Sequence, residues 1–597
     1  MYQFFTPFRR LIYALALVTA WGATAWAQEP LATIKGDMTP EVRDLVLAVL
    51  GTVETPPRSL AQARRRAKGA AEQARSVMRS QGYYAAEITA RVEEAVATNK
   101  ESSRAAPEVI LTIIPNSRFS FTDVSINYPD GPPDIATEVQ SVINLPDGAP
   151  GVAAKVVAAE IRMINLLRAK GYPSARALPR DAVVDYDNQT LSVKYNISTG
   201  VKTRFGDIVQ TGTASLAKGW PTMIAPFEAG EVFDDRQMNR LAARVIGTGV
   251  FDGATATLSD DVVPNVDGTV TRNVMLNVEQ GAINTVRGEL GYSTTEGSGI
   301  DLVYERRNFI GYAQTLRLLG TAKTNEISAG VAYNIPFAWR VDRELDLGLS
   351  VASENTDAFD GERASVNAVL TQKFAPFLKV AGGLSLEASR FEDDGQDVTS
   401  YLVDGILRAS YDSRNNLFNP VKGVHAELDV TPTYNFGKAD GFFTTAEASL
   451  SHYQRMGDRL VAAGRLKAGT IFGASQASVP LNRRYYAGGG GSVRGFGFQS
   501  ISPRDAEGEI IGGRSVLEGS AELRYRGNGA LGFVGFVDAG SVTRADVPDF
   551  TDIRYGAGVG VRYYTSFAPL RADIAIPINK RDGDNAVQIY ISIGQAF

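Results

Sequence analysis

The sequence of 597 residues contains no cysteine and only two histidines, His425 and His452. The lack of cysteine excludes disulfides, thiolate zinc sites, iron–sulfur clusters and a cysteine nucleophile. Two histidines leave little material for a histidine-rich metal site or for a catalytic triad that depends on histidine. Since no nucleophile–base pair or cofactor fingerprint is present either, we expect that the protein is not an enzyme and binds no cofactor or metal.

A surplus of positive charge and long hydrophobic runs are also lacking. Lysine and arginine number 61 against 66 acidic residues, so the formal net charge of −5 gives no reason to expect nucleic-acid binding. After residue 27 no stretch offers about 18 consecutive apolar residues, so we expect no helical membrane span there. By contrast, 59 glycines, 27 phenylalanines and 23 tyrosines are typical of a large antiparallel β protein with many turns.

The N-terminus has the pattern of a secretory signal peptide. Arg9 and Arg10 precede an uncharged run that ends in Ala25-Trp26-Ala27, a small-x-small cleavage sequence. The run is short and contains polar residues, which favours cleavage after residue 27 over an uncleaved membrane anchor. An exported chain without a later hydrophobic span is either a soluble periplasmic protein or a membrane β-barrel.

One pattern occurs three times between residues 28 and 281. Each copy has an amphipathic helix, a glycine that we expect to end it in a left-handed conformation, and a later strand. The predicted helices cover residues 60–79, 152–170 and 235–246, and the glycines are Gly82, Gly171 and Gly249. Recurrence at about 80 residues predicts a tandem array of small α+β domains.

From about residue 282 the helical pattern gives way to segments in which apolar and polar side chains alternate. In residues 345–351, for example, three leucines and a valine alternate with Asp346, Gly348 and Ser350. One apolar and one polar face is typical of a transmembrane barrel with a wet lumen, whereas a soluble sandwich would bury its apolar face. We count sixteen segments, which begin near residues 283, 299, 313, 326, 344, 364, 378, 399, 422, 442, 459, 514, 531, 554, 570 and 585. Closure into a barrel would satisfy every backbone group in lipid.

The longest gap between predicted strands runs from residue 474 to 513. Its four consecutive glycines, 488–491, raise the question of a phosphate-binding loop, but the lysine and hydroxyl of such a loop are missing and no helix follows. A plain surface loop is the simpler interpretation. A sharper one comes from the tetrapeptide after Ser492, which consists of Val493, Arg494, Gly495 and Phe496.

This tetrapeptide resembles the (V/I)RG(F/Y) motif of the BamA/TamA superfamily, whose members combine POTRA domains with a barrel. In that family the sixth large loop folds into the barrel, and its arginine contacts acidic residues on strands 12 and 13. The predicted twelfth strand has the matching G-x-x-E motif, which ends in Glu522. The thirteenth has the matching F-x-D-x-G motif, made by Phe536, Asp538 and Gly540. The resemblance therefore implies that Arg494 binds Glu522 and Asp538.

Strand parity gives the same orientation for both acids. Leu523 and Tyr525 lie on the opposite face from Glu522, and Val537 lies on the opposite face from Asp538. If the apolar face meets lipid, both carboxylates point into the lumen, where a loop arginine can reach them. The alternative is that each acid simply lines a wet pore.

The number of repeats indicates a branch of the superfamily. BamA proteins typically have five POTRA domains and two-partner secretion transporters have two, so three resembles the TamA family. The expected fold is a 16-stranded antiparallel transmembrane β-barrel preceded by three periplasmic α+β POTRA domains. The predicted boundaries are 1–27 for the signal peptide, 28–115, 116–200 and 201–281 for the POTRA domains, and 282–597 for the barrel.

The resemblance also implies partners and a location. We expect a bacterial outer-membrane protein with its POTRA domains in the periplasm, surrounded by outer-membrane lipid. The implied partners are unfolded outer-membrane protein clients and a TamB-like protein, anchored in the inner membrane, that contacts POTRA domain 1. The implied function is assembly of autotransporters and other barrel proteins. A two-partner-type secretion pore, a BamA-type general insertase and a role in phospholipid transport are the alternatives.

The predicted seam between the first and last strands contains glycines. Gly288 and Gly291 in the first strand and Gly594 in the last weaken side-chain packing, so the seam could open and offer an edge to a client strand. Alternatively, these glycines only permit curvature. The chain stops at Phe597, and a terminal phenylalanine on an alternating strand resembles the insertion signal of bacterial outer-membrane proteins.

Overall fold

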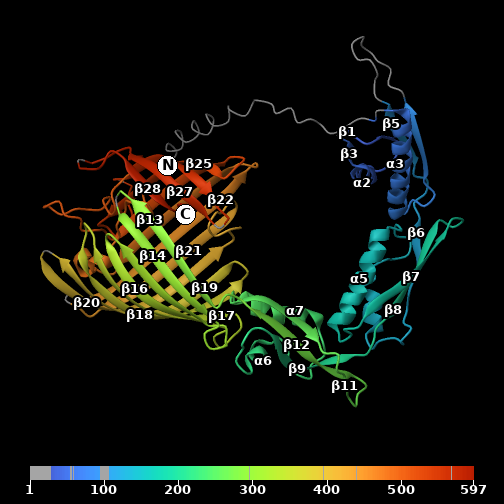
Figure 1. Cartoon of the computed structure of the whole chain (residues 1–597), viewed down its shortest axis with the longest axis horizontal. Helices are drawn as coiled ribbons and strands as arrows, with labels where there is room; N and C mark the ends of the chain where they lie inside the picture. The colour runs from blue at the N-terminus through green and yellow to red at the C-terminus, as the bar shows by residue number, and fades with distance from the viewer. Residues whose placement is uncertain are drawn as a thin grey trace, which may run out of the picture. The chain divides into compact units, whose positions relative to one another are not determined.

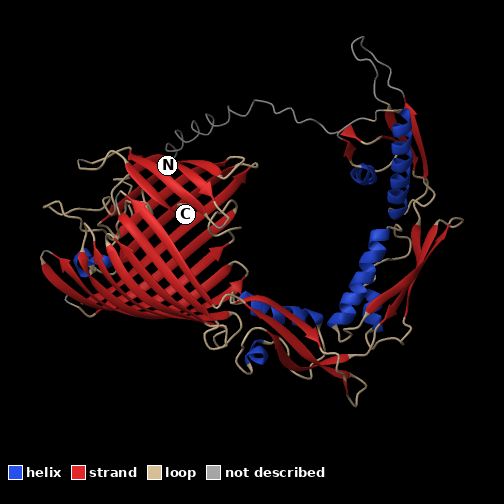
Figure 2. Ribbon diagram, in the orientation of Figure 1, coloured by secondary structure: helices blue, strands red, loops and turns tan. Residues whose placement is uncertain are grey.

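The computed structural model describes residues 29–53, 57, 59–93, 107–294, 296–393, 395–437, 440–550, 552–566, 568–581 and 583–597. The predicted signal peptide lies outside these residues. Helices and strands alternate in the first part of the chain, and strands dominate from β13 onward (Figures 1 and 2). None of the described helices has the length and apolar character needed to cross a membrane.

The first domain packs two helices against a three-stranded sheet of order β2-β5-β4. Its elements are β1 (Glu29–Pro30), β2 (Thr33–Lys35), α2 (Pro40–Leu50), β3 (Thr52–Val53), α3 (Leu60–Ser80), β4 (Glu87–Glu93) and β5 (Glu108–Ile114). Val46, Met78 and Leu111 are buried where the helices meet the sheet. Strand β2 is parallel to β5, and β4 is antiparallel to it and lies at the sheet edge.

The second and third domains repeat this arrangement. The second contains β6 (Ser120–Asn127), α4 (Ala136–Ser141), α5 (Ala153–Ala169), β7 (Arg176–Asp185) and β8 (Thr190–Ser198). The third contains β9 (Thr203–Gly212), α6 (Trp220–Ile224), α7 (Asp235–Gly247), β10 (Phe251–Leu258), β11 (Val263–Pro264) and β12 (Val270–Gln280). In each, the opening strand pairs with the closing one, β6 with β8 and β9 with β12.

The predicted helices agree with α3, α5 and α7 to within one residue at each end. The glycines expected to follow them, Gly82, Gly171 and Gly249, all have positive φ angles, of 89°, 106° and 69°. A left-handed residue at these points ends the helix, which is why glycine recurs there.

Strands β13 to β28 form a closed barrel in which every neighbouring pair is antiparallel (Figure 2). They are β13 (Asn284–Ser293), β14 (Gly297–Arg307), β15 (Thr315–Lys323), β16 (Glu326–Pro336), β17 (Arg343–Asn355), β18 (Asp360–Ala375), β19 (Leu378–Asp393), β20 (Gln396–Asp412), β21 (Gly423–Asn435), β22 (Gly441–Met456), β23 (Leu460–Phe472), β24 (Ser515–Arg526), β25 (Leu531–Thr543), β26 (Arg554–Tyr564), β27 (Pro569–Pro577) and β28 (Gln588–Ile593). Each of the sixteen predicted segments corresponds to one strand, and each start is correct to within four residues.

The two faces of the barrel wall differ as strand parity predicts. On β24, Leu523 and Tyr525 are exposed to 48% and 41%, whereas Glu522 between them is exposed to 4%. On β25, Val537 is exposed to 49% and Asp538 to 1%. Apolar side chains therefore cover the outside of the wall, and the charged ones point into the lumen, as in transmembrane barrels.

The seam between β13 and β28 is short. All residues of β13 pair with β14, but only Tyr292 and Ser293 pair with β28, opposite Ile591 and Tyr590. Thr294, just past β13, adds a backbone hydrogen bond from its N–H to the Ile589 carbonyl at 3.0 Å. Every pair of the register lies at one end of the seam, so the β13 edge from Asn284 to Gly291 has no strand pairing with β28.

The predicted position of Gly594 in the last strand is wrong. Gly288 and Gly291 lie in β13, but β28 ends at Ile593 and Gly594 follows it. Gly594 has a φ of 95°, a conformation outside the strand region, and its N–H donates to the Pro569 carbonyl at 2.7 Å. A left-handed residue here turns the chain out of the ladder.

Phe597 is consequently not on an alternating strand, and that prediction is also wrong. The Arg524 guanidinium lies 5.3 Å from the centre of the Phe597 ring, and Arg524 Nη2 donates to the Phe597 carbonyl at 3.2 Å. The Tyr453 ring centre is 6.2 Å from that of Phe597. Because Arg524 and Tyr453 are buried on the lumen side, the end of the chain is held against the inner wall by a cation and an aromatic ring.

Candidate functional site

The segment between β23 and β24, residues 473–514, is called loop 6 here. It contains two short 3-10 helices, Gln476–Ser478 and Leu481–Arg483, and is otherwise irregular. Val479, Ala487, Val493, Phe496 and Ile501 of the loop form one buried cluster with Phe443, Ile471, Val516 and Val542 of the wall. The loop is therefore folded against the barrel, and the interpretation as a plain surface loop is wrong.

Arg494 of loop 6 lies in a buried cluster of acidic side chains. Its Nε and Nη2 donate to the two carboxylate oxygens of Asp538 at 2.7 and 3.0 Å, and its backbone N–H donates to the same side chain at 3.1 Å. Nη1 lies 2.8 Å from Glu522 Oε1, an ion pair without hydrogen-bond alignment, and 3.2 Å from Asp573 Oδ2. The guanidinium also stacks on Phe536, 3.5 Å from the ring centre. We call Arg494 with its three acidic partners the Arg494 anchor.

The sequence interpretation named Glu522 and Asp538 but missed Asp573 and the ring of Phe536 as contacts of Arg494. Asp573 lies on β27 between the exposed side chains of Ala572 and Ile574, so strand parity already placed it in the lumen. What the sequence could not show is that loop 6 passes within reach of β27.

Further arginines complete the network around the anchor. Arg562 forms an ion pair with Asp573, and Arg524 Nε donates to Glu522 Oε2 at 2.7 Å. Arg571 lies 4.0 Å from Asp573. Four arginines and three acids therefore share this buried cluster. Removing one member of a buried pair typically costs about 3–5 kcal/mol, because the other charge remains desolvated.

Two glycines let the loop backbone approach the wall. Gly495 has a φ of 102°, and a Cβ there would lie 2.7 Å from the Ile576 carbonyl oxygen. A Cβ on Gly540 would lie 2.6 Å from Cγ2 of Val493. The glycines of both motifs are thus explained by close contact between loop 6 and the wall.

Loop 6 has a second anchor that the sequence interpretation missed. Arg483 Nη2 donates to Glu387 Oε2 and to Asp404 Oδ2, each at 2.9 Å, and Asn482 Nδ2 donates to Glu387 Oε1 at 3.0 Å. Glu387 and Asp404 are buried on β19 and β20. We call this group the Arg483 anchor. The only available signal was two acids on the polar face of neighbouring strands, which many wet pores share.

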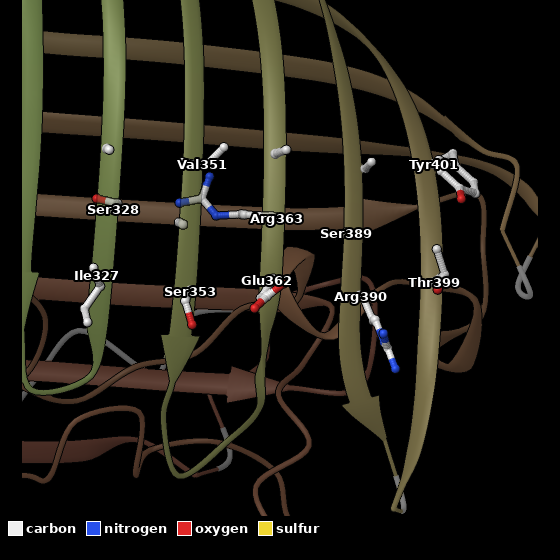
Figure 3. Close-up of a pocket in the computed structure, with 14 residues that line it drawn as sticks. Ile327, Ser328, Val351, Ser353, Glu362, Arg363, Ser389, Arg390, Thr399 and Tyr401 are labelled. Atoms are coloured by element: carbon white, nitrogen blue, oxygen red, sulfur yellow. The ribbon is translucent and has the colours of Figure 1, made fainter.

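A hollow of about 530 Å³ lies in the wall formed by β16 to β20 (Figure 3). Small side chains, Ala329, Ala364 and Ala388, line it together with Ile327 and Tyr401. Its charged lining residues are Glu362, Arg363 and Arg390; Arg363 pairs with Glu354, and Arg390 pairs with Asp397. Within the described ranges, no group of three or more histidine or acidic side chains is arranged to hold a metal ion.

Two family models match parts of the chain. The Omp85 superfamily domain matches residues 281–597, and the first POTRA domain of TamA matches residues 32–112. Among curated proteins, the outer membrane protein assembly factor BamA of Nitratidesulfovibrio vulgaris is 22% identical over 392 residues. That match covers 62% of this chain but only 48% of that BamA, so the chain spans about half of it.

The chain is also similar to a vertebrate protein and to a solved structure. The sorting and assembly machinery component 50 homolog B of Xenopus laevis is 24% identical over 401 residues, which are 60% of this chain and 83% of that protein. The crystal structure of BamA from Haemophilus ducreyi lacking POTRA domains 1–3 aligns with a TM-score of 0.66 at 17% identity. It covers 80% of this chain and 100% of that one, which shows a shared fold.

Proposed function

The chain belongs to the Omp85 superfamily, and we propose that it assembles β-barrel proteins, autotransporters among them, in the bacterial outer membrane. In this proposal the barrel spans that membrane and the domains before β13 stand in the periplasm. The observation that carries the proposal is the seam, where β13 pairs with β28 at two positions and with β14 along its whole length. Assembly factors named BamA among its relatives support the same conclusion.

The unpaired part of β13 is the feature that would receive a client. From Asn284 to Gly291 the strand has a partner on the β14 side but no strand pairing on the β28 side. Such an edge presents backbone N–H and C=O groups that another strand can bind by β-augmentation. A client hairpin that adds there would enter the membrane already hydrogen-bonded, which removes the main cost of burying backbone in lipid.

We further propose that a TamB-like periplasmic protein binds the first domain. Residues 32–112 match the first POTRA domain of TamA, which supports this partner. A groove of about 450 Å³ lies between α3 and the edge strand β4, lined by Ala67, Ala71 and Ala90 and by the charged side chains of Arg64, Lys68, Glu72 and Arg75. Because Glu72 pairs with Arg75, the cations of Arg64 and Lys68 remain for an extended segment with acidic side chains that adds to the sheet at β4.

Depletion of the protein, followed by quantitative proteomics of outer membranes, tests the proposed function. We expect a limited set of autotransporter-like barrel proteins to fall while growth continues. A fall of nearly all barrel proteins with arrest of growth would instead indicate a general insertase. Loss of a single secreted protein with an unchanged outer-membrane proteome would indicate a secretion pore and would contradict the proposal.

A further inference from the structure

We propose that loop 6 clasps the seam. Its residues 489–496 contact both Glu296 of the β13–β14 turn and Tyr590 of β28, and so bind the two sides of the seam to one another. Glu296 and Tyr590 are then positioning residues that determine how easily β13 and β28 separate. The clasp is a property of the folded barrel, and its importance for clients rests on the function proposed above.

On the β13 side the contact is a hydrogen bond to the Glu296 carboxylate. The Gly490 N–H donates to Glu296 Oε1 at 3.1 Å. Glu296 is itself held by its backbone N–H, which donates to Ser293 Oγ at 3.0 Å. Ser293 is one of the two β13 residues that pair with β28. Loop 6 is therefore connected to β13 at the position where the seam pairs.

On the β28 side the contact is made by the buried side chain of Tyr590. Its hydroxyl accepts a hydrogen bond from the Gly495 N–H at 3.1 Å and donates to the Phe496 carbonyl at 3.4 Å. Tyr590 is the residue of β28 that pairs with Ser293. The same seam pair is thus bound to loop 6 from both strands.

The close approach explains why this part of loop 6 consists of glycines. A Cβ on Gly489 would lie 2.9 Å from Glu296 Oε1, and a Cβ on Gly490 would lie 2.9 Å from Cδ1 of the Tyr590 ring. Gly489 also has a φ of 98°. A side chain at either position would require the loop, Glu296 or Tyr590 to shift. Glycine at 489 and 490 therefore fits the close contact of loop 6 with the seam.

The clasp acts through a loop that is fixed elsewhere. The Arg494 anchor holds loop 6 to β24, β25 and β27, and the Arg483 anchor holds it to β19 and β20. Because these strands lie away from β13, loop 6 cannot simply move with β13 when the seam opens. Separation of the strands must break the Glu296 contact or the Tyr590 contact in addition to the two seam pairs.

Hydrogen exchange of the full chain, reconstituted in phospholipid nanodiscs, measures seam opening without reference to clients. In Glu296→Ala we expect amides of 588–593 to exchange about three- to tenfold faster, the factor expected for one lost hydrogen bond. Glu296→Gln keeps an acceptor oxygen and should stay within about twofold of the wild type. Glu326→Ala, an acid of the β15–β16 hairpin at the same end of the barrel, is the matched control and should leave these amides unchanged.

Two variants test the clasp from its other components. Tyr590→Phe removes the hydroxyl and keeps the ring, and Gly490→Ala places a methyl against that ring, so both should accelerate the same amides. Unchanged exchange in Glu296→Ala and Tyr590→Phe, in barrels that remain folded on gels, would overturn the clasp and leave the proposed function standing. Faster exchange together with unaltered assembly of clients would support the clasp and count against the seam as their route.

Discussion

Arg494 binds Asp538 through three hydrogen bonds at once, from Nε at 2.7 Å, from Nη2 at 3.0 Å and from its own backbone N–H at 3.1 Å. The guanidinium contacts hold the Arg494 side chain on Asp538, and the N–H contact holds the loop backbone at the same carboxylate. A guanidinium is suited to this task because its planar donors match a carboxylate. Loop 6 is therefore held against the inner wall of the barrel at β25.

Loss of Arg494 should release loop 6 and abolish activity in a barrel that still folds. Arg494→Ala leaves Glu522, Asp538 and Asp573 without their shared cation, which we expect to cost about 3–5 kcal/mol. Protease cleavage within residues 473–514 should become much faster, while the barrel remains resistant. Arg504→Ala, which changes an exposed arginine of the same loop, should leave cleavage and activity at wild-type values. Full activity of Arg494→Ala would contradict a role of the anchor in assembly.

Arg494→Lys should not restore function. A lysine carries the charge but lacks the planar set of donors that binds both oxygens of Asp538 and approaches Glu522 and Asp573 together. We expect loop cleavage close to that of Arg494→Ala in the same protease assay. Wild-type protection in the lysine variant would mean that charge alone, without the geometry of the guanidinium, holds the loop.

The Arg483 anchor should contribute separately from the Arg494 anchor. Arg483→Ala leaves Glu387 and Asp404 buried beside each other, although Asn482 and Thr433 still donate hydrogen bonds to them. We expect early cleavage near residues 476–483 and a lower temperature of barrel unfolding in a heat-modifiability gel. Arg484→Ala is the neighbouring control, since Arg484 donates to carbonyls of the loop itself. Equal effects of the two substitutions would argue against a specific wall contact.

The second domain should lose stability in acid through Asp134. Hydrogen bonds from Lys202 and then from Tyr172 lower the pKa of Asp134 below its usual 3.8. A lowered carboxyl pKa means that the stabilisation is present above the usual value and is lost as the pH falls through the lowered one. Protection of the amides of residues 134–172 against hydrogen exchange, taken relative to the intrinsic rate at each pH, should therefore fall below about pH 4. Asp134→Asn should remove this acid dependence, and an unchanged profile would contradict it.

The contact between Asp134 and Tyr172 should also stop stabilising the second domain at high pH. Burial, with a further contribution from Asp134, raises the pKa of Tyr172 to about 12. The stabilisation is present below the ordinary tyrosine pKa and is lost as the pH rises through about 12. In Tyr172→Phe, ultraviolet titration should lose one late-ionising tyrosine. Titration of all tyrosines near their usual pKa in the wild type would contradict this assignment.

The positions of the strands and of two anchor acids follow from local pattern. A barrel strand lies between lipid and water, so alternation along the chain fixes which face Glu522 and Asp538 occupy before any contact is known. Asp573 had the same parity, but its partner depends on the path of loop 6 through the lumen. The contacts of Arg483 and Glu296 likewise depend on the path of loop 6, which no periodic pattern in the sequence indicates.

At the end of the chain, the sequence pattern predicts a longer strand than the structure contains. Alternation through Val587, Ile589, Ile591 and Ile593 predicts a strand that continues to Phe597, because the pattern itself has no stop signal. One left-handed glycine, Gly594, ends the ladder, and the Arg524 guanidinium then offers Phe597 a position on the inner wall. Backbone conformation and one cation–aromatic contact therefore override the strand pattern.

A reversible lock on the seam tests the central claim most directly. The chain has no cysteine, so Tyr292→Cys with Ile591→Cys, at facing seam positions, creates one disulfide without a background. The matched control is Leu349→Cys with Val366→Cys, at facing positions of β17 and β18. Client insertion into vesicles is then measured before and after reduction. We expect the oxidised seam pair to be inactive and to recover on reduction, with the control active throughout; full activity of the oxidised seam pair would contradict insertion through the seam.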